Sequence, residues 1–194
     1  NPEDLLGRRF GLGCDHVREA EVVDADGRVL RVTEDEHPDL FWGLRGAGGG
    51  QFGVVTALRF DTVPEPLTTR IEARWSDIAL EELVSAWQAW APDAPDELTV
   101  NLTLVSGAPV RAILFGAATL DEGATRELLR EFVALEIELR PGLPFHHLKR
   151  TFADPREEPE RAVRIRSEFF SHAMSDRTLA SLLTQLGDPP GRRE

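Results

Sequence analysis

The feature that most constrains this chain is a glycine cluster between a short amphipathic segment and a β-branched one. Five of the eight residues from Gly46 to Gly53 are glycine. Because glycine lacks a Cβ atom, such a loop lets backbone N–H groups approach a ligand closely. Successive N–H groups can then form a concave site for an anion or a dinucleotide. The alternative is a tight connection between a helix and a strand that binds nothing.

The glycine cluster does not match the commoner phosphate-binding motifs. No Lys-Ser or Lys-Thr pair follows the glycines, which excludes a P-loop. The glycines precede a strand instead of opening a helix, which excludes the dinucleotide-binding fingerprint of a βαβ unit. The glycine content alone therefore leaves the identity of the ligand open.

The residues around the cluster predict a small β-sheet with one helix. Residues 17–24 and 28–33 are predicted to be two strands joined by a tight turn, and residues 52–60 a third strand. We expect the helix to begin at Pro38, because proline suits the first helical position, and to end at Gly46.

Two prolines within residues 63–67 predict a boundary, which gives domains 1–64 and 65–194. Beyond it the hydrophobic periodicity predicts an antiparallel sheet with both helices on one face. The expected elements are a strand at 70–75, a helix at 79–91, strands at 98–105 and 110–116, a helix capped by Asp121 and a strand at 135–139. Residues 141–164 are predicted to be irregular, 167–170 a short strand and 175–186 a helix.

The overall composition excludes several classes of partner. The formal net charge of −12 argues against nucleic acid and anionic membrane surfaces. No apolar stretch approaches the roughly 20 residues that a membrane span needs. No secretory leader is visible, which favours the cytoplasm over secretion. The single cysteine, Cys14, excludes an internal disulfide and is expected to be a small buried hydrophobe.

The polar residues offer no metal or nucleophile site. His146 and His147 are adjacent, and neighbours in an extended segment point in opposite directions and chelate poorly. The acidic residues between 154 and 160 are interpreted as a solvated surface. Asp15 is expected to fix a turn by accepting backbone N–H bonds, and His16 is also assigned a structural role.

Three ordered blocks carry a family resemblance: Gly11–His16, Ala20–Val29 and Pro38–Val55. Together they make the stretch Gly11–Asp61 similar to the second half of the PCMH-type flavin-binding domain of FAD-linked oxidases related to berberine bridge enzyme. The resemblance implies FAD as the cofactor. It also implies that the segment after the helix wraps the adenosine end of FAD. The residues implied are Gly48, Gly49, Gly50, Gln51, Phe52, Gly53, Val54 and Val55.

The second half of the chain also resembles this family, in which a substrate domain follows the flavin domain. Trp87–Leu98 is similar to the first helix and exit of that domain, and Arg166–Phe170 to a later strand that faces the substrate. The implied fold class is α+β. It consists of the C-terminal part of a PCMH-type FAD-binding domain followed by an antiparallel-sheet substrate domain with helices on one face.

The implied activity is that of an FAD-dependent oxidase. Such an enzyme transfers a hydride from a small alcohol, sugar or amine substrate to flavin and then reduces dioxygen. The family's Gly-Gly-His segment, which carries the flavin-attaching histidine, is not found here. The chain also has no tyrosine, which relatives often use as catalytic base. The catalytic residues therefore stay unassigned, and the chain alone is expected to lack turnover.

Two other interpretations remain open at this point. The chain could be a non-catalytic fragment or an α+β binding and interaction module with an incomplete flavin site. The same fold could also hold a different nucleotide. As a fragment, the chain would expose an apolar face that favours a homodimer. The expected partners are a small-molecule substrate and, in that case, a second copy of the chain.

Overall fold

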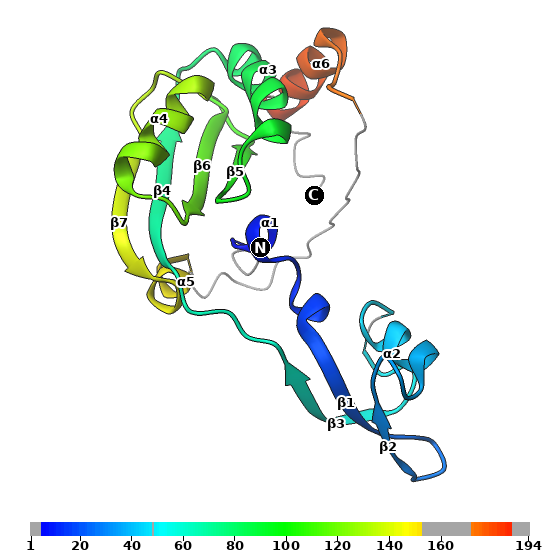
Figure 1. Ribbon diagram of the computed structural model, residues 1–194. Coiled ribbons are helices and arrows are strands. Elements are labelled where there is room, and N and C mark those ends of the chain that lie inside the picture. Colours follow the sequence, from blue (N-terminus) through cyan, green and yellow to red (C-terminus); the bar gives the residue numbers. More distant parts are fainter. Residues whose placement is uncertain (1–4, 48, 153–171, 188–194) are drawn as a thin grey trace. The chain divides into compact units, whose positions relative to one another are not determined.

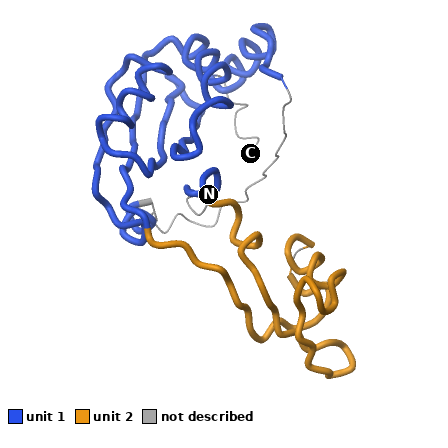
Figure 2. The backbone as a smooth tube through the Cα atoms, viewed as in Figure 1, with its two compact units in different colours: residues 1–9, 66–194 blue, residues 10–65 orange. Residues whose placement is uncertain are grey.

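The computed structural model describes residues 5–47, 49–152 and 172–187. The chain divides into two compact units, which Figure 2 shows in different colours. Unit 2 comprises residues 10–65, and unit 1 comprises residues 1–9 and 66–194. The division at residue 65 lies beside the boundary expected from the prolines. The first nine residues group with unit 1, where Leu5 is 1% exposed and packs with Ala117 and Leu148.

Unit 2 is a three-stranded antiparallel sheet with one helix (Figure 1). The strand order is β2-β1-β3. Its elements are η2 (Gly13–His16), β1 (Val17–Val23), β2 (Val29–Val32), α2 (Pro38–Leu44) and β3 (Val54–Phe60). The helix begins at Pro38 as the sequence predicts, and it ends at Leu44, two residues before Gly46.

Unit 1 contains a four-stranded antiparallel sheet in the order β5-β6-β4-β7. The short helix α1 (Gly7–Phe10) lies where the chain leaves unit 1 for unit 2. The remaining elements are β4 (Leu67–Trp75), α3 (Leu80–Trp90), η3 (Ala91–Asp93), β5 (Leu98–Val105), β6 (Arg111–Ala118), α4 (Glu122–Phe132), β7 (Glu138–Pro144), α5 (Phe145–Phe152) and α6 (Asp176–Gly187).

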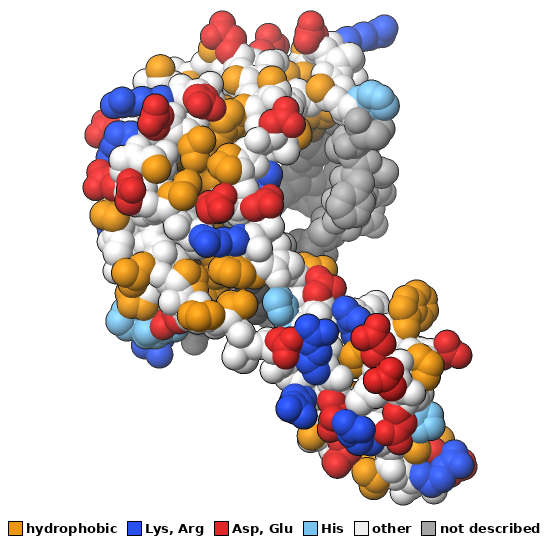
Figure 3. Space-filling model, viewed as in Figure 1, with side chains coloured by type: hydrophobic (Ala, Val, Ile, Leu, Met, Phe, Trp, Pro, Cys, Tyr) orange, Lys and Arg blue, Asp and Glu red, His pale blue; other side chains and the backbone are white. Residues whose placement is uncertain are grey.

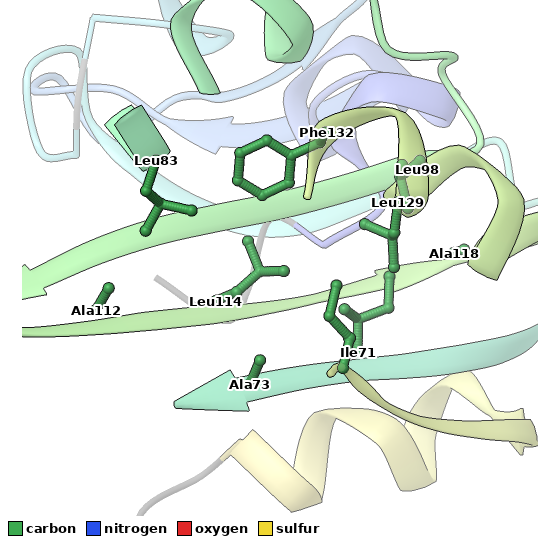
Figure 4. Packing of buried hydrophobic residues seen from close by; sticks show 10 residues of the cluster. Ile71, Ala73, Leu83, Leu98, Ala112, Leu114, Ala118, Leu129 and Phe132 are labelled. Carbon is green, nitrogen blue, oxygen red and sulfur yellow. The ribbon is translucent and has the colours of Figure 1, made fainter. Parts of the chain in front are cut away.

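The main core of unit 1 lies between its sheet and the helices α3 and α4. Leu83 from α3 and Leu129 and Phe132 from α4 converge on Leu114 and Ile71 of the sheet (Figure 4). All five side chains are at most 6% exposed. The prediction of an antiparallel sheet with these two helices on one face is therefore confirmed.

Two predictions for the middle of the chain are wrong. The last strand of the sheet runs over Glu138–Pro144 instead of 135–139, and α5 occupies residues that were expected to be irregular. Strand β7 lies at an edge of the sheet, where a proline removes no needed hydrogen bond, so Pro141 does not interrupt it. Helix α5 is held by Leu148, which is fully buried. The predicted strand at 167–170 lies outside the described residues.

None of the helices among the described residues is both long and apolar enough to span a bilayer.

Candidate functional site

The glycine cluster forms the wall of a concavity of about 370 Å³ in unit 2. Its position is the turn between α2 and β3. The lining residues are Leu44, Arg45, Gly46, Gly49, Gly50, Gln51, Phe52, Gly53 and Val55. Six of the eight residues expected to bind the cofactor therefore lie around one space. Val54 does not line it and is 66% exposed, and Gly48 lies outside the described residues.

One glycine of the turn is required by the backbone itself. Gly53 has a φ of 143°, and a Cβ atom there would lie 2.4 Å from the carbonyl oxygen of Val23 in β1. Another close approach occurs at Gly43, where a Cβ atom would lie 2.8 Å from the ring of Phe52. That ring is therefore pressed against the backbone of α2, so these glycines bring β1, α2 and the turn together.

Three other glycines of the turn face open space. A Cβ atom on Gly46, Gly49 or Gly50 would meet no atom within 4 Å. The turn is thus not filled by its own neighbours. Gly50 still has a φ of 77°, a conformation that side chains disfavour, whereas no such constraint applies to Gly46 or Gly49. At these three positions the absence of a side chain leaves room beside the backbone, and the backbone conformation favours glycine only at Gly50.

Arg45 is the charged residue of the lining, and the sequence analysis did not select it. Its Nε atom donates a hydrogen bond to the carbonyl oxygen of Cys14 at 3.0 Å. Its Nη2 atom lies 3.8 Å from Oδ1 of Asp15, and its Cζ atom is 5.4 Å from the ring centroid of Phe41. These contacts hold the guanidinium beside the glycine turn. The sequence feature that could have identified Arg45 is its position directly before Gly46.

The short segment before β1 supports Arg45. Asp15 accepts a hydrogen bond from the backbone N–H of Leu12 at 2.9 Å, which confirms its predicted role in a turn. His16 contacts the carbonyl oxygen of Phe10 through Nε2 at 2.5 Å. Cys14 is only half-buried, so the prediction of a buried hydrophobe is wrong. Its backbone carbonyl is the group that contributes, because it orients Arg45.

The described ranges of the chain contain no group of three or more His, Cys, Asp or Glu side chains that could hold a metal ion. His146 and His147 lie in helix α5, not in an extended segment, and their ring centroids are 4.1 Å apart. The acidic residues between 154 and 160 lie outside the described residues.

Comparison with known proteins gives a family context for this geometry. No family model matches the chain. The chain is 38% identical over 102 residues to the uncharacterized FAD-linked oxidoreductase YgaK of Bacillus subtilis, and the match covers 50% of this chain and 23% of that protein. It is 36% identical over 101 residues to berberine bridge enzyme-like 16 of Arabidopsis thaliana, covering 51% and 19%. The chain thus spans about a quarter or less of these relatives.

A solved structure shows the same fold. BBE-like #28 from Arabidopsis thaliana superposes on 97% of this chain with a TM-score of 0.76 and 25% sequence identity, and the match covers 42% of that protein. The resemblance and the fold class inferred from the sequence are both confirmed by these comparisons.

Proposed function

We propose that this chain, a relative of the berberine bridge enzyme-like FAD-linked oxidoreductases, binds the adenosine diphosphate end of FAD at the turn between α2 and β3. The observation that carries the proposal is the open space beside Gly46, Gly49 and Gly50. A Cβ atom on Gly13 would also meet nothing, so the open space carries the proposal because these three glycines line one concavity. The space of about 370 Å³ lies at the lower end of the range usual for small-molecule sites.

The lining residues divide into two groups that suit the two parts of such a ligand. Backbone N–H groups along residues 49–51 and the guanidinium of Arg45 would hold the diphosphate, because both favour negative charge. Leu44, Phe52 and Val55 would form the apolar side against adenine. The size of the space fits one end of FAD and not the whole molecule.

When bound, FAD would supply the redox chemistry, which we propose is the two-electron oxidation of a small alcohol, sugar or amine with dioxygen as the final acceptor. The residues of this chain would bind and orient the nucleotide end of the cofactor. No side chain of the described residues is assigned as catalytic base. We therefore expect the chain alone to bind FAD weakly and to show no turnover.

Thermal unfolding in the presence of FAD, ADP or FMN tests this proposal. A ligand that binds only the native state stabilises it, by about 1.4 kcal/mol at roughly ten times its Kd. FAD and ADP should both raise the Tm, whereas FMN, which lacks the adenosine end, should not. Equal shifts with FMN, or no shift with FAD or ADP, would contradict an adenosine diphosphate site.

A pair of glycine variants connects the effect to the pocket. Gly49→Glu places a bulky negative charge where the backbone is open, and it should abolish the shift caused by ADP. Gly13→Glu is the matched control, since a Cβ atom on Gly13 also meets nothing within 4 Å and Gly13 does not line the pocket. If both variants respond to ADP as the original chain does, the ligand binds elsewhere.

A further inference from the structure

Arg45 differs from two other arginines of unit 2 in what holds it. Arg18 and Arg31 lie 2.5 Å and 2.6 Å from carboxylate oxygens, which neutralise their charge. Figure 3 shows acidic and basic side chains interspersed in this way over unit 2. The close partner of Arg45 is instead a neutral group, the carbonyl oxygen of Cys14, and the carboxylate of Asp15 is 3.8 Å away. The positive charge of Arg45 is therefore left largely available to an anion.

The contacts of Arg45 occupy one side of its guanidinium group. Nε donates a hydrogen bond to the carbonyl oxygen of Cys14 at 3.0 Å, and Nη2 donates one to that of Asp15 at 3.5 Å. A guanidinium has five N–H groups, two of them on Nη1. None of the residues that the structure describes accepts a hydrogen bond from Nη1. Because Arg45 lines the concavity, Nη1 is the atom available to a ligand there.

The two carbonyl groups that hold Arg45 belong to a turn closed by Asp15. Oδ2 of Asp15 accepts a hydrogen bond from the N–H of Leu12 at 2.9 Å, and the N–H of Asp15 donates to the carbonyl oxygen of Leu12, also at 2.9 Å. These two bonds fix the segment η2 at the start of β1. The turn that they close presents the consecutive carbonyl groups of Cys14 and Asp15 to Arg45.

Gly11 allows this turn to form. It has a φ of 78°, and a Cβ atom there would lie 3.2 Å from Oδ2 of Asp15. A side chain at position 11 would thus be strained and would also crowd the carboxylate. Gly13 has no such role, since a Cβ atom there meets nothing and would leave the acceptors of Arg45 in place. The segment Gly11–Asp15 therefore acts on the concavity without lining it.

We infer that the turn Gly11–Asp15 is a positioning element for phosphate recognition, which holds Arg45 with Nη1 available to a diphosphate oxygen. A free arginine side chain loses conformational freedom when it binds a ligand, and this loss weakens binding. Here the turn restricts Arg45 on folding, before any ligand arrives. The inference rests on the proposed function. It adds Asp15, a residue that acts on the ligand only through Arg45.

Asp15 could act on Arg45 through its charge or through the turn, and the structure favours the turn. The ion pair is 3.8 Å long and its side chains are 36% and 55% exposed, so it contributes little. The hydrogen bond to the N–H of Leu12 is short and closes the turn. Asparagine at position 15 keeps an acceptor for this N–H but not the charge, whereas alanine keeps neither. Asp15→Asn should therefore behave as the original chain, and Asp15→Ala should not.

NMR titration with ADP and with adenosine tests the inference, because adenosine lacks the phosphates. Arg45→Ala should weaken ADP binding by at least about tenfold, and Asp15→Ala by about threefold. Both variants should bind adenosine as the original chain does. In an Arg45→Ala background, Asp15→Ala should cause no further loss of ADP binding, since Asp15 acts through Arg45.

The matched control is Asp24→Ala. Asp24 also closes a turn, by accepting the N–H groups of Asp26 and Arg28 at 2.9 Å, and it is also paired with an arginine, but it does not line the concavity. It should leave the ratio of ADP to adenosine affinity unchanged. Without any ligand, the Nε–H resonance of Arg45 should be protected from exchange with water in the original chain and in Asp15→Asn, and should lose that protection in Asp15→Ala.

The possible failures are distinguishable. If the original chain binds ADP and Asp15→Ala binds it equally well, the inference is overturned and the nucleotide site stands. The same holds if Asp24→Ala weakens ADP binding as much as Asp15→Ala does, or if Asp15→Asn weakens it as much. If the original chain does not bind ADP, the proposed function and the inference are both overturned.

Discussion

The two units have the same kind of architecture but differ in how far their strands are buried. Each is an antiparallel sheet with helices on one face. Among the described residues, the main core cluster holds ten buried hydrophobic residues in unit 1 and five in the smaller unit 2. Unit 1 has the core of an independent domain, whereas unit 2 leaves the hydrophobic residues of β3 exposed.

The difference originates in one strand of each sheet. Strand β6 lies inside the sheet of unit 1, with β5 on one side and β4 on the other, and five of its eight residues are buried. Strand β3 has one neighbour and no buried residue. The two strands have comparable apolar content, so burial here depends on what the surroundings provide. The candidate nucleotide site lies in the less complete unit, at the start of β3.

The largest expected effect separates the cores. Leu114→Ala removes a fully buried side chain from unit 1 and should lower the free energy of unfolding by about 3 kcal/mol. The same change at Leu135, which is 42% exposed, should cost no more than about 0.5 kcal/mol. Urea denaturation in a Trp42→Phe background measures both, because the three remaining tryptophans belong to unit 1.

Hydrogen exchange tests whether the two units unfold independently. Amides of β1 should exchange at unchanged rates in Leu114→Ala if the units unfold independently. Equal acceleration in both units would mean that they form one cooperative structure, and the contrast between a complete and an incomplete unit would then lose its meaning.

A smaller effect is expected at two glycines, one in each unit, that allow neighbouring backbone segments to come close together. A Cβ atom on Gly116 would lie 2.1 Å from the carbonyl oxygen of Thr99, and one on Gly53 would lie 2.4 Å from that of Val23. Gly116→Ala and Gly53→Ala should each cost about 1–3 kcal/mol through overpacking. The first should accelerate hydrogen exchange in β5 and β6, and the second in β1 and β3.

The control for this pair is Gly46→Ala, since a Cβ atom there meets nothing. It should leave exchange unchanged in both units. If Gly53→Ala also leaves the β1 amides protected, the close approach of β1 to the turn is not what requires glycine at position 53.

The elements that the sequence predicts well are those whose own residues determine them. Strand β5 alternates apolar and polar residues and matches its predicted limits of 98–105. Asp121 caps α4 as predicted, and its side chain accepts a hydrogen bond from the N–H of Ala124. Strand β7 was misplaced because its location at a sheet edge makes Pro141 acceptable, and that location depends on β4, far away in the sequence.

In the candidate site, too, the features that local sequence determines were predicted and those that depend on tertiary contacts were not. Glycine composition was enough to find the turn, because the missing Cβ atoms are a local property. Val54 was included although strand alternation directs it away from the face of Val55, which lines the pocket. Arg45 was missed because its role depends on the carbonyl of Cys14, which comes close only in the folded unit. Local patterns thus predict the turn, and tertiary contacts choose the side chains around it.

The smallest expected effect concerns acid stability, and it compares one arginine-paired carboxylate from each unit, Glu19 in unit 2 and Glu72 in unit 1. In unit 2 a side-chain hydrogen bond from Arg31 lowers the pKa of the half-buried Glu19 below its usual value of 4.5. In unit 1 burial acts to raise the pKa of Glu72. Hydrogen bonds and charges from Arg74 and Arg70 outweigh that burial, so the pKa of Glu72 is also lowered from 4.5.

A lowered pKa means that the unfolded chain binds protons first as the pH falls. The stabilisation is therefore present above about pH 4.5 and is lost as the pH falls through the lower pKa of the folded state. Glu72→Gln should remove part of the acid sensitivity of unit 1, by less than about 1 kcal/mol.

Added salt should weaken the contribution of Glu19 more than that of Glu72, because Glu19 is the more exposed to solvent ions. Urea denaturation of Glu72→Gln and Glu19→Gln from pH 6 down to about pH 3 measures both effects. An unchanged pH profile for Glu72→Gln would show that the pairing of Glu72 with Arg70 and Arg74 does not contribute to the stability of unit 1.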